Sequence, residues 1–174
     1  MEQITTARLF MRQFSESDVT EEYVAALNDP EIVRFTEARH TRWTTEKVVQ
    51  YVKQSNQVGR FELYGMFVKT TDKHIGNIRL SGFSAQHNRM DLGIMIFDRG
   101  QWSKGYATEA IIGITNHLLG GRGFHRICAD YYASNTASAR IFSKAGYKIE
   151  GVFKDHFLLD GEYVDSIRIA RVNE

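Results

Sequence analysis

Cysteine and proline are almost absent from this chain of 174 residues, which has one of each, Cys128 and Pro30. A single cysteine excludes an internal disulfide and a metal site built from several cysteines. The six histidines show no pair at metal-ligand spacing, so we expect no metal ion. No apolar run reaches the roughly 18 residues that a membrane-spanning helix needs, and the first residues lack the basic flank and apolar stretch of a signal peptide. The sequence therefore predicts a cytoplasmic protein.

An excess of either charge is also lacking. Lysine and arginine total 22, aspartate and glutamate total 21, and the net charge is +1. This balance disfavours binding to nucleic acid or to a membrane through bulk charge, but it is compatible with a local phosphate site. Linkers rich in Gly, Ser and Pro, repeats and low-complexity tracts are absent too. We expect residues 1–174 to form a single domain.

Apolar periodicity and turn residues predict seven strands and four helices. Three strand-like runs in the first half are joined by short turns, which indicates an antiparallel meander, and one strand–helix–strand crossover follows it. Ser17 or Asp18 is the expected N-cap of the first helix, and Asn135 or Thr136 is that of the last. The expected strands are Ala7–Gln13, Leu63–Thr70, His74–Ser81, Arg89–Phe97, Arg126–Tyr132, Tyr147–Lys154 and Tyr163–Arg171, and the expected helices are Asp18–Leu27, Glu46–Gln54, Gly105–Leu119 and Thr136–Ala145.

The stretch Asp98–Ala110 lies between an expected strand and a strongly amphipathic helix. A loop that enters a helix presents unpaired backbone N–H groups and the positive end of the helix dipole. Gly105 removes the side chain where an anion would approach, and Arg99 and Lys104 add positive charge. The pattern favours a pyrophosphate site, although neither the Walker loop nor the dinucleotide fingerprint is present. An ordinary glycine at a helix start is the competing interpretation.

Three motifs, in order and at matching spacing, resemble the GNAT acyltransferase superfamily. The first is Trp102-Ser103-Lys104-Gly105-Tyr106-Ala107, similar to the coenzyme A loop but with Trp where the superfamily has Arg or Gln. The second is Asn135–Phe142 followed by Lys144-Ala145-Gly146-Tyr147, and the third is Glu150-Gly151 with Asp160–Asp165. The resemblance runs from about Ala7 to Arg171 and is greatest to the branch that includes the Rim-type ribosomal-protein N-acetyltransferases.

This resemblance implies an α+β GNAT fold, a mixed and mostly antiparallel sheet of about seven strands with flanking helices. It also implies a cleft where the fourth strand, Arg89–Phe97, splays from the fifth, Arg126–Tyr132. Acetyl-CoA, the implied co-substrate, would lie in that cleft with no metal. The residues implied to bind it are Met95, Ile96, Phe97, Trp102, Ser103, Lys104, Gly105, Tyr106, Ala107, Thr108, Asn135, Ser138 and Lys144.

The implied reaction is direct attack of a primary amine on the thioester, with backbone N–H groups near Met95 stabilising the developing oxyanion. Many members protonate the thiolate with a tyrosine at the position of Phe142, which has no proton to give. The resemblance therefore favours Ser138 as the proton donor.

The sequence does not identify the group that accepts the ammonium proton. Rim-type enzymes can carry a glutamate where this sequence has Phe157. Nearby Asp155 and His156, and Asp91 on the strand that enters the cleft, are the candidates, and a carboxylate would need a raised pKa or a water relay. An acceptor that arrives unprotonated would need no base.

The acceptor is expected to lie against Asn28–Trp43 and Asp155–Tyr163. Arg34, Phe35, Arg39 and Trp43 make this wall basic and aromatic, which favours an anionic acceptor such as a nucleotide-linked amino sugar, because arginine matches phosphate geometry. A protein N-terminus is the alternative, and a polyamine fits a basic wall less well. In another class, a module that binds acetyl-CoA without turnover is possible, and a different nucleotide-binding protein is a third. A homodimer through Tyr163–Arg171, expected at a sheet edge, is allowed.

Overall fold

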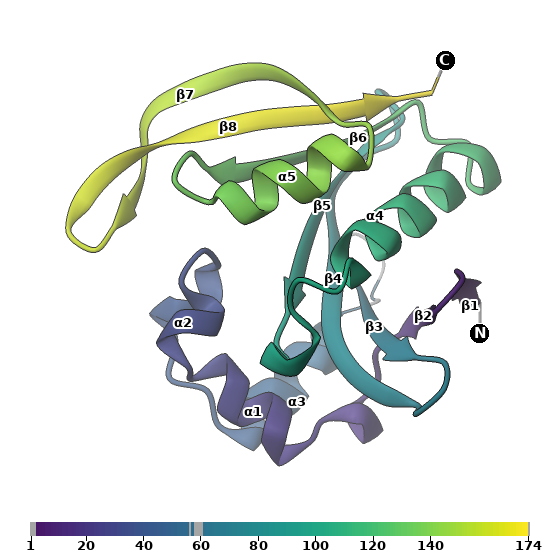
Figure 1. The fold of residues 1–174 in the computed structure, drawn as a ribbon, viewed down its shortest axis with the longest axis vertical. Helices are drawn as coiled ribbons and strands as arrows, with labels where there is room; N and C mark the ends of the chain where they lie inside the picture. The colour runs from purple at the N-terminus through teal and green to yellow at the C-terminus, as the bar shows by residue number, and fades with distance from the viewer. Residues whose placement is uncertain (1–2, 56, 58–60, 174) are drawn as a thin grey trace.

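A computed structural model describes residues 3–55, 57 and 61–173. One sheet of eight strands in the order β1-β2-β3-β4-β5-β6-β8-β7 forms its centre (Figure 1). The α+β architecture matches the expectation, with one more strand, because β1 spans only three residues at the start of the chain. The strands are β1 Gln3–Thr5, β2 Leu9–Gln13, β3 Glu62–Val68, β4 Lys73–Ser84, β5 Arg89–Ile96, β6 Arg126–Tyr132, β7 Lys148–Leu159 and β8 Glu162–Val172.

The helices begin at polar residues that accept a backbone hydrogen bond, or at a glycine. Thr20 caps the first helix, accepting from the Tyr23 N–H. The expected start at Asp18 is wrong, because Glu16–Asp18 forms a separate turn of 3-10 helix. Asn135 caps the last helix as expected, accepting from the Ser138 N–H at 3.0 Å. The helices are α1 Glu21–Leu27, α2 Pro30–Val33, α3 Thr45–Gln54, α4 Tyr106–Asn116 and α5 Thr136–Lys144, with shorter turns η1 Glu16–Asp18, η2 Glu37–His40, η3 Arg99–Gln101 and η4 His117–Gly121.

Two apolar clusters cover the two faces of the sheet. Alternate β3 residues serve different clusters: Tyr64 and Met66 pack with Ile111 and Ile114 of α4, whereas Leu63 packs toward α1 and α3. This alternation follows from the two-residue period of a strand. In Figure 1, α4 and α5 accordingly lie on one side of the sheet and α1–α3 on the other. None of the helices in the described residues is long and apolar enough to cross a membrane.

The sheet opens between β5 and β6, the fifth and sixth strands in its order. β5 and β6 run parallel and pair only at Arg89↔Arg126, Met90↔Ile127 and Asp91↔Cys128. β5 continues to Ile96 and β6 to Tyr132 without further pairing between them. The two strands therefore diverge, as the expected cleft between Arg89–Phe97 and Arg126–Tyr132 requires.

The expected edge position of the last strand is wrong. β8 lies between β6 and β7 and pairs with both, so β7 is the strand at this edge. β7 also extends five residues past the expected Lys154, to Leu159. A bulge makes this possible: Asp155 has a φ of 50°, and its N–H donates to Asp165 of β8 at 3.1 Å. The argument that β8 offers a free edge for a homodimer is thereby removed.

We expect a largely buried histidine to make the fold sensitive to acid. His74, at the start of β4, lies among the rings of Phe14, Tyr23, Phe67 and Phe97, and its Nε2 contacts the Gly76 carbonyl at 2.9 Å. Burial lowers the pKa of His74 from 6.5 to about 4. Between these values the unfolded chain binds a proton that the folded chain does not, so stability falls as the pH drops through this window.

We expect the unfolding free energy to fall by about 3 kcal/mol more in the unmodified protein than in His74→Gln between about pH 7 and pH 4. Glutamine retains a polar side chain but cannot titrate. Urea unfolding at a series of pH values measures both, and carboxylate contributions cancel in the comparison. Parallel pH curves for the two proteins would contradict a neutral buried His74.

Candidate active site

The loop between β5 and α4 is built for the close approach of an anion. Ser103 and Gly105 have positive φ values of 60° and 82°, and Gly105 is the N-cap of α4. A glycine accepts this left-handed conformation without strain and presents no Cβ. The Gly105 carbonyl accepts from the Glu109 N–H at 3.0 Å, so the N–H groups of the first turn, Tyr106–Thr108, precede the helical hydrogen bonds and point outward from the helix end.

Several expected cofactor residues meet around one hollow. Gly105 and Thr108 at the start of α4 and Lys144 at the end of α5 line a cavity of about 600 Å³ together with Thr6 and Ala7 of the β1–β2 turn. Its walls combine a helix N-terminus, which favours negative charge, with a lysine. These groups fit a phosphorylated ligand such as coenzyme A.

The end of β5 presents backbone N–H and C=O groups to the gap between β5 and β6. The Phe97 N–H donates to Ile75 of β4 at 3.0 Å, so in an antiparallel ladder the N–H and C=O groups of Ile94 and Ile96 point to the other side, where β6 has diverged. The Trp102 indole N–H donates to the Ile96 carbonyl at 2.9 Å. Trp102 therefore connects the loop to β5 and occupies one of the acceptors expected for the pantetheine arm.

The two cations expected to add charge to the loop have different surroundings. Arg99 makes ion pairs with Asp29 and Glu31, both at 2.7 Å, and so connects η3 to α2. Lys104 is exposed, and its Nζ donates to Gln101 at 3.3 Å. Arg99 is thus directed to carboxylates of α2, whereas Lys104 stays at the surface of the loop.

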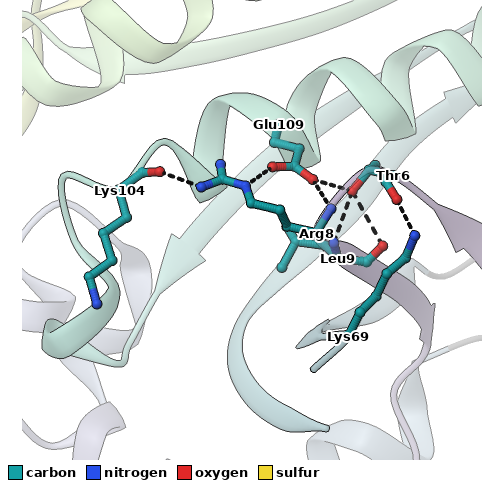
Figure 2. Close-up of polar contacts among 6 residues, drawn as sticks. All are labelled: Thr6, Arg8, Leu9, Lys69, Lys104 and Glu109. Atoms are coloured by element: carbon teal, nitrogen blue, oxygen red, sulfur yellow. Dashed lines mark hydrogen bonds and ion pairs between the residues drawn. The ribbon is translucent and has the colours of Figure 1, made fainter. Parts of the chain in front are cut away.

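An ion pair that sequence reasoning missed joins this loop to the N-terminal hairpin (Figure 2). Arg8 Nε donates to Glu109 Oε2 at 2.6 Å, and Arg8 Nη1 donates to the Lys104 carbonyl at 2.9 Å. The other Glu109 oxygen accepts from the Thr6 hydroxyl and from the Arg8 N–H, each at 2.6 Å. The only signal in the sequence is Glu109 in the first turn of α4, because its partners lie 101 and 103 residues away.

Ser138 lies one turn into α5 with its hydroxyl available. Asn135 holds its backbone N–H, and the Ser138 hydroxyl makes no hydrogen bond to any residue in the described ranges. The side chain is half-buried, next to Ala139, which packs against the core. Phe142, one turn further, is 3% exposed and contacts the Tyr147 ring edge-on at 5.0 Å between centroids.

The three candidate bases lie in different places. Asp91, at the point where β5 and β6 separate, pairs with Arg168 at 2.5 Å, and Arg168 also pairs with Asp130 at 2.8 Å. Asp155 and His156 lie in the exposed bulge of β7. The His156 ring contacts Phe153 and Phe157. The structure does not bring these three side chains together.

Two arginines of the expected acceptor wall line one cavity. Arg34 and Arg39 line a cavity of about 360 Å³ with His40, Arg42 and Asp160. Arg34 pairs with Asp160 at the tip of the β7–β8 hairpin at 2.9 Å, and Arg39 donates to the Leu158 carbonyl at 2.8 Å.

Phe35 and Trp43 occupy different positions. Phe35 lies beside Tyr132 of β6, with ring centroids 5.6 Å apart. Trp43 packs against Tyr51 at 5.7 Å and donates from its indole to the Ala38 carbonyl at 2.9 Å. It is therefore a half-buried part of the α1–α3 cluster rather than of the cavity lining.

Tyr132, at the end of β6, is a contact point of the acceptor wall that the sequence analysis named only as the end of an expected strand. Its ring stacks on Phe157 at 4.1 Å, the Arg39 guanidinium lies 5.1 Å from its centroid, and its hydroxyl donates to Glu37 at 3.3 Å. Burial raises the pKa of Tyr132, so it stays a neutral donor. A carboxylate from η2 thereby lies near Phe157, the position where Rim-type enzymes can carry a glutamate.

Known proteins are similar to this chain in sequence or in fold. An uncharacterized N-acetyltransferase of Bacillus licheniformis is 25% identical over 173 residues, 95% of this chain and 93% of its own length. The ribosomal-protein alanine N-acetyltransferase of Escherichia coli is 27% identical over 124 residues, 68% and 61% of the two chains. The solved structure of RimL, a ribosomal-protein α-N-acetyltransferase in complex with coenzyme A, superposes with a TM-score of 0.89 at 18% identity over 98% of both chains.

The family model described as the Acetyltransferase (GNAT) domain matches residues 8–148, from the β1–β2 turn to the first residue of β7. That span contains the diverging strands, the Gly105 loop and α5. The chain therefore belongs to the GNAT family of acetyltransferases, which use acetyl-CoA as the acetyl donor.

Proposed function

We propose that this N-acetyltransferase transfers the acetyl group to the primary amine of a small molecule that carries an anionic group, such as a nucleotide-linked amino sugar. The observation that carries the proposal is the basic cavity of Arg34, Arg39, His40 and Arg42, which lies beside Tyr132 at the end of β6. Only one carboxylate, Asp160, is among the residues that line it. A net positive cavity favours phosphate or carboxylate on the acceptor.

The acetyl donor would be held by backbone groups on both sides of the opening. The outward N–H groups of α4 and Lys144 would bind the phosphates, and Ile94 with the N–H of Ile96 would pair with the pantetheine amides. The thioester supplies the activated acetyl group. The protein then contributes position, which brings the amine and the acyl carbon together.

Two proton transfers involve side chains. Ser138, whose hydroxyl has no hydrogen-bond partner among the described residues, would donate a proton to the departing thiolate. For the ammonium proton, Asp91 is already held by Arg168, whereas Asp155 and His156 are open to solvent. The exposed position of these two groups suits a water relay better than direct contact with the amine.

An N-terminal acetyltransferase of a protein substrate is the second candidate. It is favoured by the relative named as a ribosomal-protein alanine N-acetyltransferase. A peptide would need an open channel rather than a charged cavity, and the contacts of Arg34 and Arg39 with the β7–β8 hairpin narrow the space on this side.

An acceptor screen distinguishes these candidates. We expect thiol release from acetyl-CoA with amino-sugar nucleotides, and a KM at least about 10-fold lower than with the matching neutral amino sugar. N-terminal peptides and polyamines are the other two arms. Preferential turnover of either would contradict the proposed acceptor.

A charge reversal tests the same cavity. Arg42→Glu should raise the KM for the anionic acceptor about 10-fold and leave acetyl-CoA affinity unchanged. Lys53→Glu is the matched control, because it makes the same change in net charge on α3, where Lys53 faces Glu16. Equal effects of the two variants would mean that only the overall charge matters.

A further inference from the structure

The guanidinium of Arg8 is fixed at the edge of the loop. Its Nε and Nη1 are used by Glu109 and the Lys104 carbonyl, and its plane lies over the Tyr106 ring with the central carbon 4.4 Å from the centroid. Three contacts with neighbours in the loop and the first turn of α4 leave the group little rotational freedom. Such a preorganised arginine loses less entropy when it binds a further group.

The remaining nitrogen donor of this guanidinium is Nη2. Nη2 makes no hydrogen bond to any of the residues at 3–55, 57 and 61–173. It lies 3.4 Å from the point that a Cβ on Gly105 would occupy, so it borders the open side of the cap residue. The Arg8 side chain is 46% exposed, so a ligand at the loop can reach it.

Glu109 explains how this cation is held. Its carboxylate is 16% exposed and accepts three hydrogen bonds, from the Thr6 hydroxyl, the Arg8 N–H and Arg8 Nε. The last of these is also an ion pair. Although burial acts to raise it, these hydrogen bonds hold the pKa of Glu109 below its ordinary value. A bare carboxylate in the first turn of α4 would repel a phosphate, and pairing with Arg8 removes that repulsion while aiming Nη2 outward.

We propose that Arg8 is a phosphate-binding residue for coenzyme A, donating through Nη2 beside Gly105, and that Glu109 is its positioning residue. The inference rests on the proposed phosphate site at the start of α4. Arg8 would donate a charge-assisted hydrogen bond to a phosphate oxygen, in addition to the hydrogen bonds from the backbone N–H groups of the loop. The pyrophosphate and the 3′-phosphate of coenzyme A are the two groups that could accept it.

Calorimetric titration with coenzyme A tests the assignment without turnover. Arg8→Gln should raise the Kd about 10-fold to 100-fold, and Arg8→Lys, which keeps the charge but not the fork, should have a smaller effect. The same titration with dephospho-coenzyme A distinguishes the two phosphates: a retained Arg8→Gln effect assigns the pyrophosphate, and a lost effect assigns the 3′-phosphate. Acetylpantetheine, which has neither, should show an unchanged KM in Arg8→Gln.

Glu109→Gln tests whether Glu109 positions Arg8 for binding or only stabilises the fold. It should raise the Kd about 3-fold to 10-fold alone but add almost nothing to Arg8→Gln, because Glu109 acts through Arg8. Arg12→Gln is the matched control: Arg12 also pairs with a carboxylate, Asp18, at 2.6 Å and lies over a ring, Phe67, at 4.3 Å. It should lower the melting temperature and leave the Kd unchanged.

Two outcomes would overturn the inference. One is an Arg8→Gln protein that binds coenzyme A within about twofold of the unmodified protein, whatever its melting temperature. The other is additive loss of affinity in the double variant. If the unmodified protein itself fails to bind coenzyme A, the proposed phosphate site at the start of α4 is wrong. That result is distinguishable from the two outcomes above, in which the unmodified protein does bind.

Discussion

Replacing Ser138 with alanine should lower kcat for acetyl transfer by about 10-fold to 1000-fold, the range of a single proton donor, and leave acetyl-CoA affinity nearly unchanged. The reason is the position of the hydroxyl, which has no partner in the described part of the chain and lies on the first turn of a helix capped by Asn135. Steady-state kinetics and a calorimetric titration give the two quantities.

A matched serine on the same helix provides the control. Ser143 is exposed near the end of α5, so Ser143→Ala should leave kcat unchanged. Phe142→Tyr introduces a hydroxyl one turn beyond Ser138 on the same side of the helix, and it should recover part of the lost kcat in the Ser138→Ala background. A Ser138→Ala enzyme with full kcat would mean that the thiolate takes its proton from water.

Replacing Gly105 with valine should weaken acetyl-CoA binding by about 100-fold or more. The Gly105 φ of 82° lies in the left-handed region, where a β-branched residue is strained by about 1–2 kcal/mol. The new side chain would also approach Arg8 Nη2, which lies 3.4 Å from the Cβ position. Both effects act where a phosphate oxygen would contact the loop.

Gly123→Val controls for the backbone strain. Gly123 has a φ of 70° and open space around its Cβ position, and it lies between η4 and β6, away from the loop. It should lower stability by a similar amount, measured by urea unfolding, without changing acetyl-CoA affinity. If Gly105→Val also keeps its affinity, the phosphate site is not at this loop.

Local elements of this fold were predictable because their signals are local. The α4 start at Gly105-Tyr106, the Asn135 cap and the β3–β5 meander each depend on residues within a few positions of one another. β7 was predicted too short for a local reason as well. The polar run Lys154-Asp155-His156 reads as a strand end, but the Asp165 carboxylate accepts from the Asp155 N–H and stabilises a bulge, so the strand continues.

Long-range arrangements could not be predicted from the residues. The sequence contains no mark that β8 pairs with β6, because strand order depends on which strands meet after the chain collapses. The contact of Arg8 with Glu109 spans 101 residues and looks in the sequence like two unrelated surface charges. The acceptor wall was predictable only in part. Its arginines were identified from the sequence, whereas the half-buried packing of Trp43 and the stacking of Tyr132 on Phe157 depend on the fold.

Amide hydrogen exchange with and without acetyl-CoA tests whether the co-substrate lies between β5 and β6. If acetyl-CoA lies between the diverging strands, it should slow exchange at the outward N–H groups of Ile94 and Ile96 and in the first turn of α4, at Tyr106–Thr108, because bound ligand atoms replace water there. Backbone amides around the basic cavity of Arg34 and Arg42 should exchange at unchanged rates until an acceptor is added. Protection by acetyl-CoA at that cavity, with none at β5 and α4, would mean that acetyl-CoA does not bind between the diverging strands.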